Sequence, residues 1–401
     1  MTKQIYPPSI TGKGSGFATG GSVLDHAFGT SDAYTLGVEE EYMLLDGETF
    51  DLVQHIDTVL AAVSGHELEA RINPELMQSV LEIATPVCHT PADVEEQLRK
   101  IRGYVCEVAR AQGLRVGSAG THPFSLFERQ RITARDRYRN LVDQLQYVAR
   151  RELIFGLHIH VAVDDPEKAV QVVNGLLLHL PQLLALSASS PFWRGEPTGL
   201  SSSRQMVFAA FPRSGPPPRF KDYADYAAVV GQLEKTGCIA DYTHIWWDIR
   251  LHPRLGTVEI RICDATTRME DVVALTAYCQ ALVKHYCEQF ERRETIASYH
   301  RILTTENKWL AARYGLEAPL MDLSTGARNR VPVAKLIRRA LKEIEPHARE
   351  LGSERELEGV GEILARGNGS DRQLRVFNAN RDIVEVVREI ADATEVAAVP
   401  V

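Results

Sequence analysis

The segment Thr35-Leu36-Gly37-Val38-Glu39-Glu40-Glu41-Tyr42-Met43-Leu44-Leu45-Asp46 places three successive glutamates inside an otherwise apolar run. Its strand-type residues and the Asp46-Gly47 turn signal predict a β-strand. Because side chains alternate between the faces of a strand, Glu39 and Glu41 share one face and Glu40 lies on the other. Two carboxylates about 7 Å apart repel each other unless a cation or a proton lies between them. The segment therefore indicates either a divalent metal site or a solvated edge strand whose acids face water.

The composition is that of an ordinary soluble globular protein. Of the 401 residues, 44% are hydrophobic and 24% are charged, which allows one large domain or two smaller ones. The net charge of −8 argues against nucleic acid as the main partner. The six cysteines include no CxxC pair, so we expect reduced thiols and a cytoplasmic protein. The most apolar stretch, residues 175–188, is interrupted by His179 and Pro181, so we expect a buried helix and no membrane partner.

The two ends of the chain are predicted to lack catalytic groups. Residues 1–33 are polar and glycine-rich, but no GK[ST] ending follows, so a flexible N-terminal tail is favoured over a phosphate-binding loop. Residues 270–398 carry charged amphipathic patterns that predict a mostly helical buttress.

Further acids and histidines fall on strand-like segments. The β-branched residues of 80–85 and the closing Pro86 favour a strand that carries Glu82, with Glu75 on the preceding turn. His158 and His160 share one face of the apolar run 155–163, either as ligands or as a buried hydrogen-bonded pair. The turn Gly120-Thr121-His122-Pro123-Phe124 could carry function, although a single histidine there is more often structural.

Residues 245–264 predict a β-hairpin with a charged inner face. Two strands, 245–252 and 257–264, flank the turn Pro253-Arg254-Leu255-Gly256. Arginines beside acids on one stripe are more typical of a site than of a solvated hairpin, which would carry lysine and threonine. The predicted inward-facing residues are Asp248, Arg250, His252, Glu259, Arg261 and Cys263. The preceding loop of small residues, 198–203, leads to Arg204, and its hydroxyl and N–H groups suit anion binding.

Together these residues form an oxygen-rich candidate set. Such a set suits Mg²⁺ or Mn²⁺ rather than zinc, and no HExxH or Cys₂His₂ spacing competes with it. Several carboxylates would hold more than one ion, as nucleoside triphosphates require. Arg204, Arg250 and Arg261 are candidate clamps for phosphate or carboxylate. The strand-borne acids and imidazole, with Glu75 on its adjoining turn, are Glu39, Glu41, Glu75, Glu82, His158 and Glu259.

Over roughly residues 34–395 the chain resembles the glutamate–cysteine ligase type 2 family, also called carboxylate–amine ligases. The resemblance rests on several motifs in order: Leu36-Gly37-Val38-Glu39-Glu40-Glu41, Glu75 with Glu82-Ile83-Ala84-Thr85, Gly120-Thr121-His122-Pro123-Phe124, Gly156-Leu157-His158-Ile159-His160-Val161, Ser187-Ala188-Ser189-Ser190-Pro191, Trp247-Asp248-Ile249-Arg250 and Gly256-Thr257-Val258-Glu259-Ile260-Arg261. It implies a glutamine synthetase-like α+β fold in one catalytic domain, residues 34–398. In that fold a curved, largely antiparallel sheet holds the active site on its concave face, with helices packed outside and a helical C-terminal part.

The resemblance also implies roles for the candidate residues. The family's metal ligands fall on Glu39, Glu41, Glu75, Glu82, His158 and Glu259. Arg261 would face the transferred phosphate, and Arg204 would meet substrate carboxylate or phosphate, so both are predicted catalytic residues. The predicted cofactor-binding residues are Arg250, Arg261 and His160.

The implied reaction is an ATP- and Mg²⁺- (or Mn²⁺-) dependent ligation through an acyl phosphate. It would join the side-chain carboxylate of glutamate to cysteine, as in glutathione biosynthesis. Three alternatives remain: the same chemistry on another acid or amine, a phosphotransferase like the guanidino kinases, and a non-catalytic binding module. The segment around Trp246-Trp247 could pack internally or at a homodimer interface.

Overall fold

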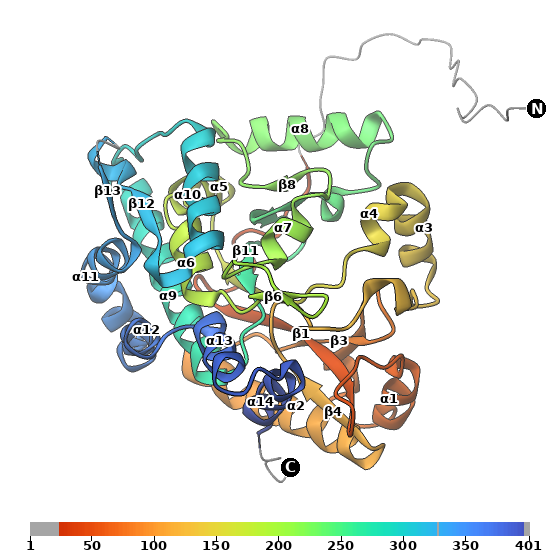
Figure 1. Cartoon of the computed structure of the whole chain (residues 1–401). Helices are drawn as coiled ribbons and strands as arrows, with labels where there is room; N and C mark the ends of the chain where they lie inside the picture. Colours follow the sequence, from red (N-terminus) through yellow and green to blue (C-terminus); the bar gives the residue numbers. More distant parts are fainter. Residues whose placement is uncertain (1–23, 327–328, 397–401) are drawn as a thin grey trace, which may run out of the picture.

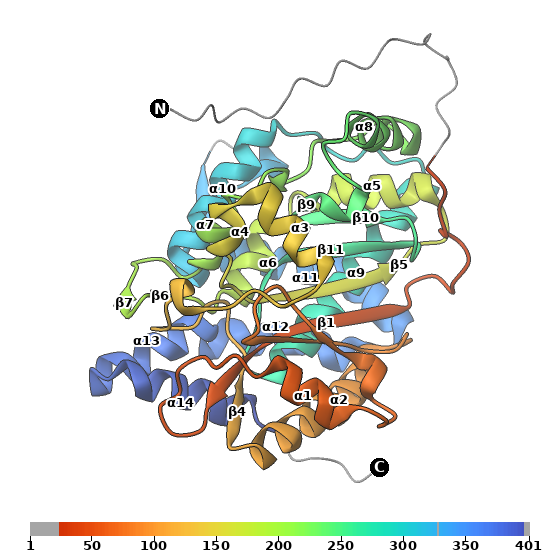
Figure 2. The same ribbon diagram turned by 90° about the vertical axis from the view of Figure 1, so that its right-hand side faces the viewer.

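An antiparallel sheet of seven strands forms the centre of the computed structural model, which describes residues 24–326 and 329–396 (Figure 1). Its order is β10-β11-β5-β1-β3-β2, and β4 pairs with β1 off this path. Figure 2 shows β10, β11, β5 and β1 side by side. The strands are β1 (Leu36–Asp46), β2 (Ile72–Pro74), β3 (Val80–Ala84), β4 (Leu114–Gly117), β5 (Gly156–Ala162), β10 (Ile249–His252) and β11 (Thr257–Asp264).

The opening segment of the sequence is β1, and it lies inside the sheet rather than at its edge. It pairs with β5, β3 and β4. The register sets Glu39 opposite His158 of β5 and Glu41 opposite Glu82 of β3. One face of β1 contributes Leu36, Val38, Tyr42 and Leu44 to the main hydrophobic core, as the alternation predicts.

Helices cover the core face of this sheet. The 23-residue α9 packs against β5, α2 and α5, and it is covered in turn by α11 and α12 (Figure 1). A capping box formed by Thr90 and Asp93 begins α2, with Pro91 in its first turn. The longer helices are α2 (Pro91–Ala111), α5 (Pro166–Leu176), α8 (Tyr223–Lys235), α9 (Met269–Glu291), α10 (Arg301–Tyr314), α11 (Val333–Leu351), α12 (Glu354–Arg366), α13 (Gly369–Asn380) and α14 (Ile383–Thr394).

The remaining helices and strands of the described residues are short. The C-terminal part is mostly helical, as expected, and its described residues also include the β12–β13 hairpin. The shorter elements are α1 (Ile56–Val63), α3 (Asp136–Leu145), α4 (Tyr147–Arg150), α6 (Leu180–Ser187), α7 (Arg204–Phe208), β6 (Phe192–Trp193), β7 (Glu196–Pro197), β8 (Ser214–Gly215), β9 (Trp246–Trp247), β12 (Pro319–Met321) and β13 (Arg330–Pro332).

Part of the predicted N-terminal tail is packed on the domain. Residues 1–23 lie outside the described residues, but residues 24–33 pack against the end of β5 and the turn between β10 and β11. Gly29 N–H donates to the carbonyl of Val163, Ala27 N–H donates to that of Pro253, and Phe28 is buried. The predicted tail of 1–33 is therefore too long at its C-terminal end, because apolar residues and backbone groups of 24–33 find partners.

In the part of the chain that the structure describes, no single helix has the length and apolar composition to cross a bilayer. The pair α5 and α6 meets both criteria only when taken together, and a bend of 65° separates them.

The predicted hairpin forms, but a bulge alters its inner face. Pairing between β11 and β5 shifts register between Ile260 and Cys263. Because the bulge breaks the alternation, Cys263 is buried in the hydrophobic core rather than beside Glu259 and Arg261. Asp248 also leaves the predicted stripe: its carboxylate accepts hydrogen bonds from Lys308 Nζ at 2.7 and 2.8 Å.

The core face of β1 also carries a buried ion pair. Glu40 is 1% exposed, and its Oε1 lies 2.5 Å from Nη2 of Arg102 on α2. Tyr42 donates its hydroxyl to Glu40 and accepts from Arg102 Nε. Glu40 therefore links the sheet to the helical layer through its ion pair with α2.

Replacing Arg102 with methionine should destabilise the fold by about 3–5 kcal/mol, because Glu40 keeps a buried charge without its partner. The double variant Glu40→Leu/Arg102→Met should recover much of this loss, since no unpaired charge remains. Urea unfolding measures both. Arg99→Met, which removes a half-exposed pair from the same helix, is the control and should cost about 1 kcal/mol or less. Equal effects at Arg99 and Arg102 would contradict this account.

His122 has a structural role in the turn that follows β4. Its Nδ1 accepts hydrogen bonds from the backbone N–H groups of Phe124 (3.2 Å) and Ser125 (2.9 Å), and Nε2 lies 3.0 Å from the Phe50 carbonyl. Only the neutral ring can accept at Nδ1. Burial lowers the pKa of His122 to about 4.

Stability should therefore depend on pH through His122. Between about pH 6.5 and 4 the unfolded chain binds a proton that the folded ring excludes, so the free energy of unfolding falls as the pH drops through this window. The contribution is at most about 1.4 kcal/mol per pH unit. Urea unfolding across this window should show a shallower slope for His122→Gln than for the wild type. Parallel pH profiles would exclude this role of His122.

Candidate active site

A cavity of about 820 Å³ lies on the face of the sheet opposite the helical core. Every site residue predicted from the sequence lines it except Arg204. They are Glu39, Glu41, Glu75, Glu82, His158, His160, Arg250, Glu259 and Arg261. Side chains from α1, α3 and the segment before β9 complete its wall.

Two clusters of carboxylate and imidazole atoms lie in this cavity and share Glu39. The Glu259 cluster consists of Glu39, His160 and Glu259, and the Glu82 cluster of Glu39, Glu82 and His158. Within each cluster the candidate ligand atoms lie within 4.8 Å of one another. The strand register produces both groupings, because β5 places His158 opposite Glu39 and His160 opposite Glu259.

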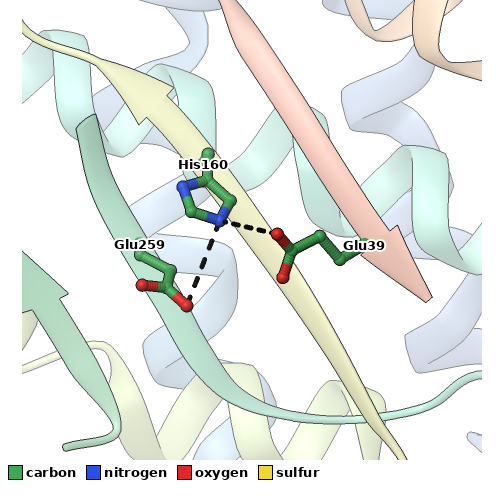
Figure 3. A group of neighbouring side chains, drawn as sticks. All are labelled: Glu39, His160 and Glu259. Carbon is green, nitrogen blue, oxygen red and sulfur yellow. Dashed lines mark ion pairs between the residues drawn. The ribbon is translucent and has the colours of Figure 1, made fainter. Parts of the chain in front are cut away.

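The Glu259 cluster surrounds a nitrogen that lacks a hydrogen-bond partner among the described residues (Figure 3). His160 Nε2 lies 3.5 Å from Glu39 Oε1 and 4.0 Å from Glu259 Oε1, while its Nδ1 lies 3.0 Å from Thr257 Oγ1. In the Glu82 cluster, His158 Nδ1 lies 3.0 Å from Glu39 Oε2. A buried, unsatisfied imidazole nitrogen between carboxylates fits a divalent cation.

The remaining acids lie beside these clusters without joining either one. Glu41 accepts a hydrogen bond from the backbone N–H of Gly156 at 2.5 Å, and Glu75 accepts one from the Tyr138 hydroxyl at 3.2 Å. Burial and the charge of Glu75 raise the pKa of Glu41 to about 7. Burial and the charges of Glu39, Glu75 and Glu41 raise the pKa of Glu82 well above its ordinary value. Excess negative charge therefore collects at this end of the cavity, where a cation would displace protons.

Arginines neutralise the other end of the cavity. Arg250 donates to Glu259 Oε2 from Nε (2.8 Å) and Nη2 (2.7 Å), and its Nη1 donates to two backbone carbonyls. Arg261 Nη1 bonds to Glu259 Oε1, while Arg261 Nε has no partner among the described residues. Although burial opposes ionisation, Arg250 and Arg261 hold the pKa of Glu259 well below its ordinary value. Arg250 thus positions Glu259, and Arg261 retains a donor; cofactor binding by either arginine stays a prediction.

Arg204 lies in a smaller adjoining cavity of about 100 Å³. Its Nη1 and Nη2 donate to the carbonyls of Ile262 (3.3 Å) and Arg261 (3.4 Å). A Cβ atom on Gly156 would lie 2.6 Å from Arg204 Nη2, so only glycine at the start of β5 admits this guanidinium. The small cavity shares Glu41, Glu75, His158 and Arg261 with the large one.

The serine hydroxyl groups that precede Arg204 in the sequence donate hydrogen bonds to a side chain of the protein, Asp264, rather than to a ligand. The buried carboxylate of Asp264 accepts hydrogen bonds from Ser190 Oγ (2.7 Å), Ser202 Oγ (2.8 Å) and the Ser189 N–H (3.0 Å). The Gln373 side chain of α13 in turn donates to the Ser189 carbonyl at 2.8 Å. The loop therefore anchors the end of β11, and the sequence-based expectation of a ligand anion there missed this internal partner.

Sequence reasoning did not single out Glu152, although it lines the small cavity. Both of its carboxylate oxygens are buried, and neither has a hydrogen-bond partner among the described residues. Burial raises the pKa of Glu152 to about 8. Its only sequence signal is an acid directly before the apolar run 153–157, which is too common to be informative.

Comparisons with known proteins identify the family of the chain. A family model described as Glutamate-cysteine ligase family 2 (GCS2) matches residues 35–391. A Rubrobacter xylanophilus protein named "Putative glutamate--cysteine ligase 2-1" is 44% identical over 367 residues, covering 92% of this chain and 96% of that protein. A Sorangium cellulosum protein named "Putative glutamate--cysteine ligase 2" is 44% identical over 360 residues, covering 90% and 96%.

A solved structure extends the comparison to the fold. The crystal structure of a glutamate–cysteine ligase from Francisella tularensis in complex with AMP superposes with a TM-score of 0.66. Its sequence identity is 13%, and the match covers 92% of this chain and 90% of that one. This likeness confirms the predicted glutamine synthetase-like α+β fold class.

The shared position of Glu39 predicts how cation binding divides between the two clusters. Glu82→Gln should weaken Mn²⁺ binding at one site, Glu259→Gln at the other, and Glu39→Gln at both, each by more than about tenfold, because a charged ligand atom is lost. Mn²⁺ titration followed by electron paramagnetic resonance, with Mg²⁺ calorimetry, measures this. Glu107→Gln, on the exposed face of α2, is the matched control. Unchanged affinity in all three site variants would reject the metal assignment.

Proposed function

The chain belongs to glutamate–cysteine ligase family 2, and from this premise we propose that it is an ATP-dependent carboxylate–amine ligase. One observation carries the proposal: two carboxylate–imidazole clusters and an arginine with an unused donor line a single cavity. The relatives' names point to glutamate as the acid and cysteine as the amine.

The proposed reaction proceeds in two displacements. First, an oxygen of the substrate carboxylate attacks the γ-phosphorus of ATP, the bond to the bridging oxygen breaks, and ADP leaves. The amine nitrogen then attacks the carbon of the acyl phosphate, the carbon–oxygen bond to phosphate breaks, and inorganic phosphate leaves. An ammonium substrate gives one proton to solvent to free the attacking lone pair, and the nitrogen gives a second proton to solvent as the amide forms. Activation is needed because an unmodified carboxylate offers no adequate leaving group.

Each group in the cavity has a place in this scheme. Arg261 directs its unused Nε donor toward charge on the transferred phosphoryl group, while Arg250 holds Glu259 in position. The donor set fits Mg²⁺ or Mn²⁺, which would offset the negative charge of the triphosphate. The residues that would hold the ions are the cluster members Glu39, Glu82, His158, His160 and Glu259, and Glu41 and Glu75 line the cavity beside them.

Replacing Arg261 with methionine should lower kcat by about 10²–10³, because one electrostatic donor to the phosphoryl group is lost. The loss should appear in ADP formation with glutamate and cysteine at saturating ATP. Arg254→Met is the control, because Arg254 is exposed on the β10–β11 turn. Equal activity of wild type and Arg261→Met would remove this residue from the mechanism.

The products distinguish the proposed route from its rivals. ADP and inorganic phosphate should form in equal amounts with the amide, which nuclear magnetic resonance of ³¹P and mass spectrometry can follow. AMP with pyrophosphate would exclude an acyl phosphate. A stable phosphorylated substrate without amide would support the phosphotransferase alternative instead.

A further inference from the structure

The small cavity combines one buried acid with an aromatic wall. We call it the Glu152 cavity; its polar groups include Glu152 and Arg204, and its wall is formed by Phe208, Phe211 and Trp246. Phe208 and Phe211 stack at 5.7 Å, and Trp246 meets Phe211 edge-on at 5.1 Å. At about 100 Å³ the cavity accommodates a small group of atoms, not a nucleotide.

Glu152 lacks the partner that a buried carboxylate normally has. Neither oxygen receives a hydrogen bond from the described residues. Among the described residues Arg204 makes no hydrogen bond or ion pair with Glu152, and its two Nη atoms donate to backbone carbonyls of β11. Its charge only partly offsets the effect of burial, which raises the pKa of Glu152. A buried, unpaired acid is costly, so its presence calls for a ligand that completes it.

The backbone around Glu152 fixes the position of this acid. Its own N–H donates to the carbonyl of Ala149 at 3.2 Å. The neighbouring Arg151 donates from Nη2 to the carbonyl of Val207 in α7 at 3.2 Å. These bonds tie the segment between α4 and β5 to the helix that carries Arg204 and Phe208, so the acid and the aromatic wall form one unit.

We propose that the Glu152 cavity binds the ammonium group of the incoming amine, with Glu152 as its counter-ion and a compact apolar side group against the aromatic wall. The inference rests on the proposed ligase function and specifies its second substrate. An ammonium group supplies the donors that Glu152 lacks, and aromatic faces also attract a cation.

The position of the cavity suits the second displacement. Glu41, Glu75, His158 and Arg261 line both cavities, so an amine bound at Glu152 lies next to the place where the acyl phosphate would form. Arg204 is 3% exposed, and its Nε has no partner among the described residues. If the amine also carries a carboxylate, this Nε is the donor available to it.

Three small ligands test the proposal by calorimetry on the full-length protein with Mg²⁺ and a non-hydrolysable ATP analogue. L-2-Aminobutyrate carries ammonium, carboxylate and a compact ethyl group. (S)-2-Hydroxybutyrate replaces the ammonium with a hydroxyl, and n-propylamine lacks the carboxylate. The wild type should bind the better of the two ammonium ligands at least about tenfold more tightly than the hydroxy acid.

Glu152→Gln should abolish this preference, and Glu306→Gln, at an exposed position of α10, should preserve it. Because the wild-type carboxylate has no partner in the free protein, Glu152→Gln should unfold at no lower temperature than the wild type. If aminobutyrate binds more tightly than propylamine, the second substrate is an α-amino acid. If propylamine binds more tightly, the second substrate is a simple amine. Either result supports the subsite. Equal binding of ammonium and hydroxy ligands, no binding of any of them, or a preference that survives Glu152→Gln would overturn it.

Phosphate release separates this proposal from the ligase function. A wild type that prefers the ammonium ligands, yet releases no phosphate with them and glutamate, would refute the ligase while leaving the subsite in place. Amine-dependent phosphate release with an unchanged KM for the amine in Glu152→Gln would refute the subsite alone.

Discussion

Repulsion among partly buried carboxylates is the constraint on which this structure depends. Strand register forces Glu39, Glu41 and Glu82 onto one face of the sheet, and Glu75 joins them from the adjoining turn. Such a set tolerates burial only if cations, protons or hydrogen-bond donors compensate it. On the reverse face, Arg102 compensates Glu40 permanently, and this pair holds β1 against α2. Strand β1 thus carries an ion-paired glutamate on the face that packs on the core, and glutamates without an arginine partner among the described residues on the face that lines the cavity.

Arginines of the described chain compensate the negative charge of the carboxylates at one end of the cavity but not at the other, so the two ends suit different ligands. Near Glu259, two arginines form ion pairs with the carboxylate, and their positive charges lower its pKa so that it stays ionised. Near Glu41 and Glu82 no arginine makes an ion pair within the described residues, and the pKa values of these acids rise. The arginine-rich end suits phosphate, and the carboxylate-rich end suits cations, whether metal ions or an ammonium group. Under the proposed function, the uneven charge would orient an anionic and a cationic substrate in the cavity.

Local patterns in the sequence predicted much of this arrangement. Alternation was enough to place Glu39 with Glu41 on one face of β1, and His158 with His160 on one face of β5. The register between β1 and β5 brings these two pairs together. Three features escaped because they depend on distant packing. The bulge in β11 that buries Cys263 arises from pairing with β5, the partner of the serine loop is Asp264 at the far end of a strand, and Glu152 is distinguished only by the hydrogen bonds it lacks. Periodicity reveals which residues share a strand face, but not which polar groups remain unpaired.

The hydrogen bond from Gln373 to Ser189, in the loop that contacts Asp264, affects when this loop can reach its final structure during synthesis. Residues 189–204 bond directly to Asp264 at the end of β11. The α13 helix adds two further hydrogen bonds, because Ser370 N–H and the Gln373 side chain donate to the carbonyls of Ala188 and Ser189. A ribosome delivers these two residues more than a hundred positions after Glu259 and Arg261. Domains generally fold as units during synthesis. The loop that leads to Arg204 therefore gains its contacts with α13 only after the strand that carries Glu259 and Arg261 has been synthesised.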